Sequence, residues 1–246
     1  MNISHIQAVI LTGGLGTRLR SVVSDVPKSM ALVNGRPFLE YQVKWLKLQG
    51  IKEFVLCTGY KSEVIESYFE DGSSWDISIV YSHEKEPLGT AGAVKNADGL
   101  LDERFLLLNG DTFCCINMVN INNYCNLSNA DLVICVAKLD ESRDYGNILA
   151  NDQGVVVQFT EKGMLNDSNI KLQRYVNAGY YLINREILMH FPAGKKSSLE
   201  KDIFPRLLEL RKKTVTFSCE SFWDIGTPDR LEYFKNNLPE FFKVLD

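Results

Sequence analysis

The chain has 246 residues, 45% of them apolar and 24% charged, which is the balance of an ordinary globular protein. Its formal net charge is −4, whereas a nucleic-acid-binding protein would show a basic excess. The longest apolar runs are only as long as strands, so we predict no membrane span. The N-terminus lacks an export signal and the six cysteines show no C-x-x-C spacing, so we expect a cytoplasmic protein with free thiols.

Strand and helix patterns alternate over the first part of the chain. Apolar runs at 8–11, 53–58, 77–81 and 105–108 predict strands, and helical spacing at 37–48, 61–69 and 90–97 predicts helices between them. The connections are long enough for parallel pairing of the strands. Ligand-binding loops of such a sheet lie at the carboxyl ends of its strands. We therefore expect the loop after residue 11 and residues 83–92 at one edge.

The second part of the chain predicts a more mixed arrangement. Its patterns indicate a helix at 117–127, strands at 131–139, 175–183 and 215–217, a hairpin at 146–160, helical stretches near Arg185 and Lys201, and a last helix from Pro228. No repeat, low-complexity tract or linker divides the chain. We therefore predict one α/β domain over residues 1–246.

The most informative stretch runs from Leu11 to Arg20, directly after the first strand, and has three glycines in four positions. Without Cβ atoms, its backbone N–H groups can approach an anion closely. Arg18 adds a planar fork of donors, and Lys28 adds a point positive charge ten residues later. A strand, a glycine turn and two separated cations predict a cradle for a triphosphate.

Two commoner phosphate loops do not fit this stretch. The dinucleotide fingerprint requires G-x-G-x-x-G, but Leu19 stands where the third glycine belongs. The P-loop requires G-x-x-x-x-G-K-[ST], and no Gly-Lys-Ser or Gly-Lys-Thr follows a glycine at that spacing. The remaining pattern is G-G-x-G-T-R-L followed by P-K.

Two aspartates are candidate metal ligands. Asp111 ends a strongly apolar strand, where its carboxylate is exposed at the ligand edge, and Asp224 follows an aromatic pair at a strand-to-loop transition. Either alone is more often a turn former or a helix cap. As a pair they suit Mg²⁺, which takes one or two carboxylates and completes its shell with substrate phosphate and water.

Residues 88–93 form a small, glycine-rich segment at the start of a predicted helix. The segment is either a tight turn into a packed helix or a flat floor for a nucleobase. Glu84 lies just before it, and a carboxylate only accepts hydrogen bonds. Guanine presents two adjacent donors, so Glu84 suits guanine better than uracil, thymine or cytosine. The alternative is that Glu84 is a solvated member of the cluster Glu84-Lys85-Glu86.

Together these motifs resemble the signature of the sugar-1-phosphate nucleotidylyltransferases. The resemblance is carried by the G-G-x-G-T-R-L loop with P-K, by Asn109-Gly110-Asp111 and by W-D-I-G-T-P at 223–228. The resemblance runs from Ala8 to Pro228, and Thr12 and Ser29 depart from the commonest residues. It implies a Rossmann-like, GT-A type mixed, mostly parallel sheet flanked by helices, without a C-terminal β-helix domain. Within the family, residues 18–28 are most similar to the D-glycero-α-D-manno-heptose 1-phosphate guanylyltransferases.

The resemblance also implies roles for individual residues. Arg18, Lys28, Asp111 and Asp224 would act on the nucleotide phosphates, with Mg²⁺ held by the two aspartates, and Lys162 would hold the sugar phosphate. The implied nucleotide-binding residues are Leu11, Thr12, Gly13, Gly14, Gly16, Thr17, Glu84, Gly89, Thr90 and Gly110. The implied sugar-phosphate-binding residues are Tyr145, Gly146, Asn147, Glu161, Lys162, Asn177 and Gly179. Gly179 interrupts a β-rich strand, which itself indicates close approach of a ligand.

The implied reaction joins a nucleoside triphosphate, here GTP, to D-glycero-α-D-manno-heptose 1-phosphate and releases pyrophosphate. The alternatives are a mannose 1-phosphate guanylyltransferase, a uridylyl- or thymidylyltransferase, and a catalytically silent homologue that binds nucleotide-sugar and regulates a partner. Apolar Phe241, Phe242 and Val244 near the C-terminus could pack on a second copy, which leaves a homodimer open.

Overall fold

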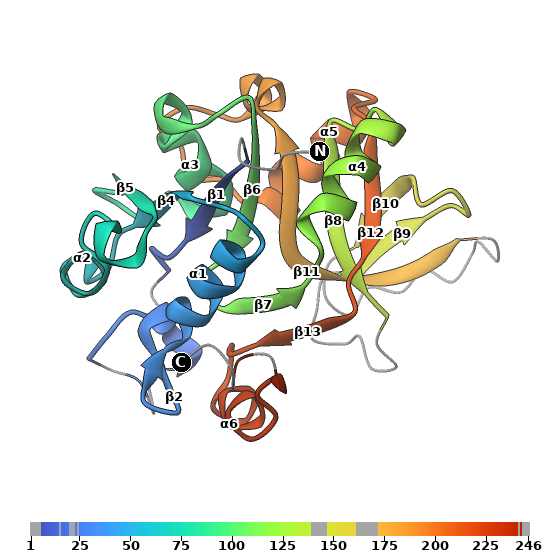
Figure 1. The fold of residues 1–246 in the computed structure, drawn as a ribbon. Coiled ribbons are helices and arrows are strands. Elements are labelled where there is room, and N and C mark those ends of the chain that lie inside the picture. Colours follow the sequence, from blue (N-terminus) through green and yellow to red (C-terminus); the bar gives the residue numbers. More distant parts are fainter. Residues whose placement is uncertain are drawn as a thin grey trace.

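A computed structural model describes residues 6–14, 16–19, 23, 25–138, 147–160, 172–240 and 242, with only the backbone at Thr17 and Thr160. Its centre is a nine-stranded sheet with the order β10-β9-β11-β6-β1-β4-β5, in which β8 also pairs with β11, and β12 pairs with β8 (Figure 1). Two small sheets, β2–β3 and β7–β13, lie apart from it.

The elements of the main sheet and of the small sheets have the following bounds. The main sheet comprises β1 (Gln7–Leu11), β4 (Glu53–Thr58), β5 (Ser78–His83), β6 (Arg104–Asn109), β8 (Leu132–Ala137), β9 (Asn147–Ala150), β10 (Val156–Thr160), β11 (Gln173–Asn184) and β12 (Thr214–Ser218). The small sheets comprise β2 (Leu32–Val33), β3 (Arg36–Pro37), β7 (Thr112–Cys115) and β13 (Ser221–Asp224). The α-helices are α1 (Phe38–Leu48), α2 (Ser62–Phe69), α3 (Gly89–Asn96), α4 (Met118–Ser128), α5 (Phe204–Glu209) and α6 (Pro228–Asn236).

Strand directions confirm the predicted mixed, mostly parallel sheet. β1 is parallel to β4 and β6, β4 is parallel to β5, and β8 is parallel to β12. β11 is antiparallel to β6, β8 and β9, and β10 is antiparallel to β9. Only β10 and β11 therefore run against the other described strands of this sheet. The carboxyl ends of β1, β4, β5 and β6 meet at one edge, as predicted.

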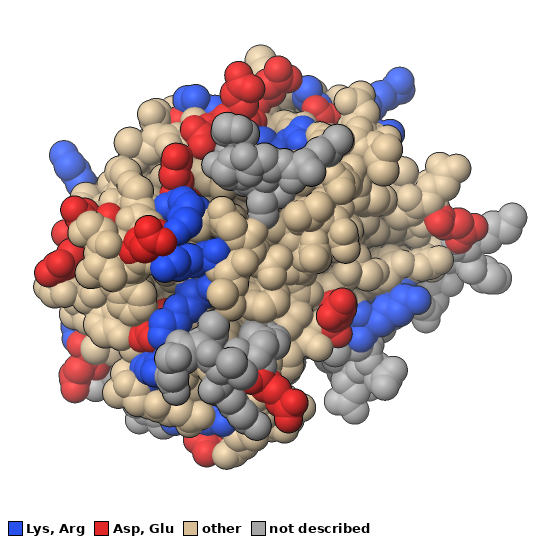
Figure 2. Space-filling model, in the orientation of Figure 1, with Lys and Arg blue, Asp and Glu red and all other residues tan. Residues whose placement is uncertain are grey.

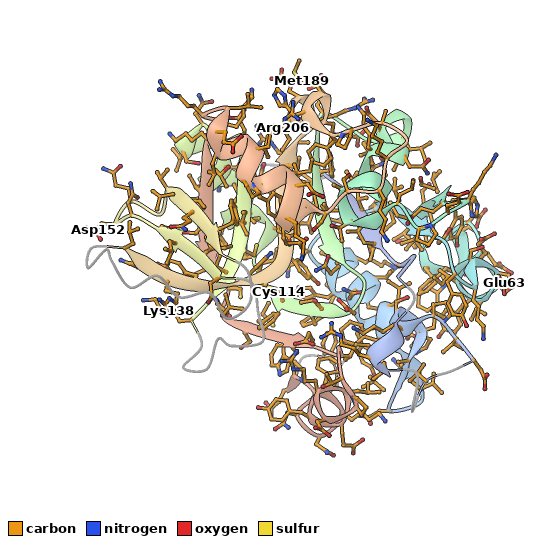
Figure 3. The ribbon with its side chains drawn as sticks, turned by 180° about the vertical axis from the view of Figure 1, so that it is seen from behind. Glu63, Cys114, Lys138, Asp152, Met189 and Arg206 are labelled. Atoms are coloured by element: carbon orange, nitrogen blue, oxygen red, sulfur yellow. The ribbon has the colours of Figure 1, made fainter. Side chains whose placement is uncertain are left out.

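Alternation along each central strand supplies a core on both faces of the sheet. In β1, Ile10 faces a core formed with α1, α2 and α4, whereas Val9 faces a core formed with α3 and α5. Figure 1 shows α1 and α4 in front of the sheet, and the view from behind in Figure 3 shows Arg206 of α5 on the other side. Strands buried on both faces read as continuous apolar runs, which is why 8–11 and 105–108 were recognisable.

A third core joins the small sheet β7–β13 to α1 and α6. Its centre is Phe234 of α6, which is fully buried and lies edge-on to Phe38 and Trp223, with ring centroids 5.1 and 6.1 Å apart. Phe242 packs edge-on against Phe113 at 4.7 Å in the same cluster. Phe242 is thus covered by its own chain and cannot serve a dimer contact, while Phe241 and Val244 lie outside the described residues.

The predicted helical stretches near Arg185 and Lys201 differ from regular α-helix. Residues Arg185–His190 form a 3₁₀-helix (η5), and Leu199–Ile203 form a turn of π-helix (η6) that continues into α5. All six cysteines are free thiols, five of them buried and Cys219 half-buried, which agrees with the prediction. Figure 3 places Cys114 of β7 in the interior. No helix in the described part of the chain is long and apolar enough to cross a membrane.

Replacing Phe234 with alanine should destabilise the fold by about 3–5 kcal/mol, because a buried aromatic leaves a cavity among its neighbours. Its neighbour Tyr233 is 60% exposed, so Tyr233→Ala should change the free energy of unfolding by no more than about 0.5 kcal/mol. Urea denaturation of both variants measures the difference. Equal midpoints would contradict the assignment of Phe234 as the anchor of α6.

Candidate active site

The loops after β1 and β6 begin side by side at the carboxyl edge of the sheet. Leu11, the last residue of β1, lies opposite Asn109, the last residue of β6. The N–H of Gly110 donates to the carbonyl of Leu11 over 3.0 Å, and a methyl group at Gly110 would lie 2.7 Å from that carbonyl oxygen. Only glycine therefore permits this close approach of the two loops.

A cleft of about 490 Å³ opens between these loops and the start of α3. The predicted residues that line it are Leu11, Thr12, Gly13, Gly14, Gly16, Arg18, Lys28, Glu84, Gly89, Thr90, Gly110 and Asp111. The cleft is also lined by Ser29, Pro87, Ala93, Asn109 and Lys196. Of these, Ala93 belongs to the predicted segment 88–93 and Asn109 to the motif Asn109-Gly110-Asp111. The structure thus brings the candidate nucleotide residues to one concave surface.

Asp111 sits in the turn between β6 and β7 and forms an ion pair with Lys28. The Nζ of Lys28 donates to Oδ2 of Asp111, and the hydroxyl of Thr112 donates to Oδ1 over 3.1 Å. Only 12% of the Lys28 side chain and 33% of the Asp111 side chain are exposed. Partial burial strengthens the attraction between these charges compared with a pair on an open surface.

Asp224 lies beside Asp111 because β13 pairs antiparallel with β7. Asp224 is opposite Thr112, and the N–H of Ile225 donates to the carbonyl of Asp111 over 2.9 Å. Oδ1 of Asp224 accepts hydrogen bonds from the N–H of Gly226 at 2.8 Å and from Nη1 of Arg230 at 3.2 Å. The second aspartate is therefore held by its own loop and by the first turn of α6.

Gly226 is the point around which the charged groups gather. A methyl group there would lie 2.6 Å from Oδ1 of Asp224, 3.6 Å from Nζ of Lys28 and 3.7 Å from Nη2 of Arg18. Since Lys28 is bonded to Asp111, both aspartates and both predicted phosphate-binding cations converge on this bare stretch of backbone. A glycine at this position leaves the space between the charges open.

The two aspartates fit a divalent cation that is completed by substrate. Asp224 ends β13 and Asp111 directly precedes the paired strand β7, and Mg²⁺ typically takes one or two carboxylate ligands together with phosphate oxygens and water. No group of three or more His, Cys, Asp or Glu able to hold a metal occurs among the described residues. Two carboxylates suit a metal whose remaining ligands are substrate oxygens and water.

Glu84 follows β5 and is directed into the cleft. Its Oε2 accepts a hydrogen bond from the N–H of Leu88 over 2.8 Å, and a methyl group at Gly13 would lie 2.6 Å from its Oε1. Burial raises the pKa of Glu84, although the Leu88 hydrogen bond acts in the opposite direction. Glu84 is half-buried, whereas Lys85 and Glu86 are exposed, so Glu84 is not simply a solvated member of that cluster.

The sugar-phosphate candidates are only partly described. Asn147 of β9 lies opposite Val176 of β11, next to Asn177, at the same edge as Asn109. Gly179 has a φ of +70°, and a methyl group there would lie 2.7 Å from Nδ2 of Asn109. The close approach expected at Gly179 is therefore made by Asn109. Tyr145, Gly146, Glu161 and Lys162 lie outside the described residues.

Comparison with known proteins identifies the family. The family model described as "Nucleotidyl transferase" matches residues 7–240. The chain belongs to this family. D-glycero-alpha-D-manno-heptose 1-phosphate guanylyltransferases from Campylobacter jejuni and Aneurinibacillus thermoaerophilus are 38% and 39% identical to it, over 94% and 96% of this chain and 99% of each relative. The crystal structure of HddC from Yersinia pseudotuberculosis complexed with GMP-PN has a TM-score of 0.81 at 30% identity, covering 95% of this chain and 100% of that one.

Two residues near the paired aspartates of this nucleotidyl transferase were not predicted from the sequence. Arg230 bonds to Asp224, and no sequence pattern indicates this contact. Gln42 is fully buried on α1, and its Nε2 donates to the carbonyls of Asn109 at 2.9 Å and Thr112 at 2.6 Å. These carbonyls flank the turn that carries Asp111. A glutamine within the apolar face of a helix was the signal that could have revealed this role.

Gln42→Met should misplace Asp111 in this nucleotidyl transferase, because it leaves two carbonyls next to the site without their donor. We expect a loss of about 1–3 kcal/mol in stability and a drop in turnover of about tenfold, measured by pyrophosphate release at a temperature where the variant remains folded. Gln49→Met is the matched control, since Gln49 directly follows the same helix and its Oε1 accepts from the N–H of Met118, away from the turn that carries Asp111. Equal turnover of the two variants would contradict the role of Gln42.

Proposed function

We propose that this nucleotidyl transferase transfers GMP from GTP to D-glycero-α-D-manno-heptose 1-phosphate with Mg²⁺, giving GDP-heptose and pyrophosphate. The observation that carries the proposal is the convergence of Arg18, Lys28, Asp111 and Asp224 around Gly226. The heptose relatives are matched over 99% of their length. A Mycobacterium tuberculosis mannose-1-phosphate guanylyltransferase is 32% identical, against 38% and 39% for the heptose relatives, which favours the heptose substrate.

The proposed reaction is a displacement at the α-phosphorus of GTP. A phosphate oxygen of the sugar 1-phosphate forms the new bond, the bond from the α-phosphorus to the bridging oxygen breaks, and pyrophosphate leaves with that electron pair. The attacking oxygen is already ionised at neutral pH, so no general base is needed. Catalysis then rests on positioning and on stabilising charge.

Each charged side chain has a task in this mechanism. Arg18 binds the leaving pyrophosphate and Lys28 binds the nucleotide phosphates, while Lys162 is proposed to hold the sugar phosphate. Asp111 and Asp224 would hold Mg²⁺, which supplies positive charge to the phosphate oxygens when bound. Arg230 keeps the carboxylate of Asp224 in place through its hydrogen bond to Oδ1.

The nucleobase is proposed to lie between Glu84 and the start of α3. Guanine offers N1–H and the 2-amino group as neighbouring donors, which match a carboxylate acceptor. The small residues at the start of α3, including Gly89 and Ala93, leave the cleft wall flat. This arrangement supports GTP over UTP and dTTP, whose rings present a single donor between two acceptors.

The proposed binding partners are GTP and a sugar 1-phosphate, with no nucleic acid and no membrane. On the face shown in Figure 2, Lys and Arg gather near β4 and α1 with acidic residues beside them, and much of the opposite half is uncharged. The formal net charge of −4 does not favour a nucleic-acid interface, which would show a basic excess. Six free cysteines are in keeping with the reducing cytoplasm as the site of the reaction.

Asp111→Asn should lower turnover about a hundredfold or more, because it weakens the proposed hold on Mg²⁺, whose positive charge would stabilise the transferring phosphate. Pyrophosphate release from GTP and heptose 1-phosphate measures the effect. Asp98→Asn serves as control, since Asp98 pairs with Lys95 and Arg185 at the other end of the sheet. Turnover of Asp111→Asn close to that of the control would refute the assignment of Asp111.

Glu84→Gln should lower the preference for GTP over UTP at least about tenfold, because the amide replaces an acceptor by a donor. The raised pKa of Glu84 adds a pH signature. The carboxylate is present above its pKa, so the wild-type preference should be lost as the pH falls through a value above the ordinary carboxyl range. The ratio of kcat/KM for the two nucleotides, measured against pH with exposed Glu86→Gln as control, tests this. A preference that is unchanged in Glu84→Gln would remove the role in base selection.

A further inference from the structure

The segment 196–200 is bound to the start of α3, the proposed floor for the nucleobase. The carbonyl of Ser197 accepts from the N–H groups of Ala91 at 3.0 Å and Gly92 at 3.4 Å, and the N–H of Ser197 donates to the carbonyl of Leu88 at 2.8 Å. Gly89 has a φ of +72°, and a methyl group there would lie 2.5 Å from the Ser197 carbonyl oxygen. The floor of the cleft is therefore built against this second segment.

Glu200 continues this contact through its carboxylate. Its Oε2 accepts from the hydroxyl of Thr90, which lines the cleft, at 3.4 Å and from the hydroxyl of Ser198 at 3.0 Å. The oxygen of Thr90 in turn accepts from the N–H of Leu199 at 2.8 Å. Glu200 lies in the π-helical turn η6, a form of backbone that is frequent at functional sites.

The other oxygen of Glu200 faces the central strand β11. The hydroxyl of Tyr181 donates to Oε1 over 3.3 Å, and Tyr181 is completely buried. Burial and then the negative charge of Glu200 raise the pKa of Tyr181. The phenol therefore stays protonated, and its proton points to the carboxylate.

Asn177 completes the connection on the sugar-phosphate side. Its Nδ2 donates to the hydroxyl oxygen of Tyr181 over 2.8 Å, and its Oδ1 accepts from the N–H of Gly179 over 3.0 Å. Both ends of the amide are thus assigned, which fixes the orientation of the side chain. The hydrogen bonds run in one direction, from Asn177 to Tyr181 to Glu200, and Thr90 donates to the same carboxylate from the other side.

We propose that Glu200 and Tyr181 are positioning residues that couple the nucleotide floor at Thr90 to the sugar-phosphate residue Asn177. The inference rests on the proposed function, because the family resemblance implies that Thr90 binds the nucleotide and Asn177 the sugar phosphate of that reaction. A carboxylate is suited to this place since it accepts hydroxyl donors at both oxygens. An amide has a single acceptor oxygen, so it would oppose the donor at one end of the chain.

Tyr181→Phe tests the coupling with little change in packing, because the ring remains against Phe204 at 5.1 Å. The probes are α,β-methylene GTP, which cannot release pyrophosphate, and D-glycero-α-D-manno-heptose 1-phosphate, both measured by titration calorimetry on the full chain. With the analogue bound, the Kd for the sugar phosphate should rise about tenfold. The Kd for the analogue alone should stay within about twofold of the wild-type value.

Glu200→Gln should weaken the binding of both ligands, since it disturbs both ends of the chain. The double variant with Tyr181→Phe should be no worse for the sugar phosphate than the poorer single variant, because both remove the same connection. Asp202→Asn is the matched control. Asp202 accepts from the N–H of Ser198 at 2.7 Å in the same turn, and it should leave both Kd values within about twofold.

The outcomes distinguish a failure of the coupling from a failure of the proposed function. A wild-type Kd for the sugar phosphate in Tyr181→Phe, or single effects that multiply in the double variant, would overturn the coupling. A wild-type protein that binds both probes but releases no pyrophosphate from GTP and the sugar phosphate would instead overturn the proposed function. The binding measurements would test the coupling in that case as well, since they require no turnover.

Discussion

The antiparallel pairing of β7 with β13 is the contact on which the site depends. It sets Asp224 opposite Thr112 and next to Asp111, and so brings two carboxylates from distant parts of the chain to neighbouring positions. Two neighbouring carboxylates that are both negatively charged repel each other. Lys28 on Asp111 and Arg230 on Asp224 offset this repulsion, and the aromatic core around Phe234 holds the two strands together.

The second requirement of the site is backbone without a side chain at two glycine positions. Gly110 lets the loop after β6 lie against the end of β1, and Gly226 leaves room for Arg18, Lys28 and Asp224 to approach one another. A side chain at Gly110 would separate the two loops, and one at Gly226 would separate the charged groups. The main sheet supplies the rigid edge, because β1 and β6 are buried on both faces and cannot shift without disturbing both cores. The loops that follow β1 and β6 therefore extend from a rigid sheet.

The parts of the molecule that depend on local pattern could be predicted from the sequence. The runs that form β1, β4 and β6 are continuously apolar, and the glycine loop with Arg18 and Lys28 is recognisable by spacing alone. The strand β7 was missed, because four residues form a strand here only by pairing with β13, more than a hundred residues later in the chain. Gln42 and Glu200 also act through contacts between distant parts of the chain, whereas Arg230 contacts Asp224, six residues earlier, across a turn that no local pattern indicates. Gly179 permits a close approach by Asn109, a contact that the local pattern around Gly179 does not reveal.

The most direct test of the central claim is a crystal structure of the protein with GTP analogue and Mg²⁺ bound. The account predicts that an α-phosphate oxygen and the metal lie beside Asp111 and Asp224, with Arg18 and Lys28 on the outer phosphates and the base next to Glu84. Nucleotide phosphates bound away from both aspartates and from Arg18 would contradict it.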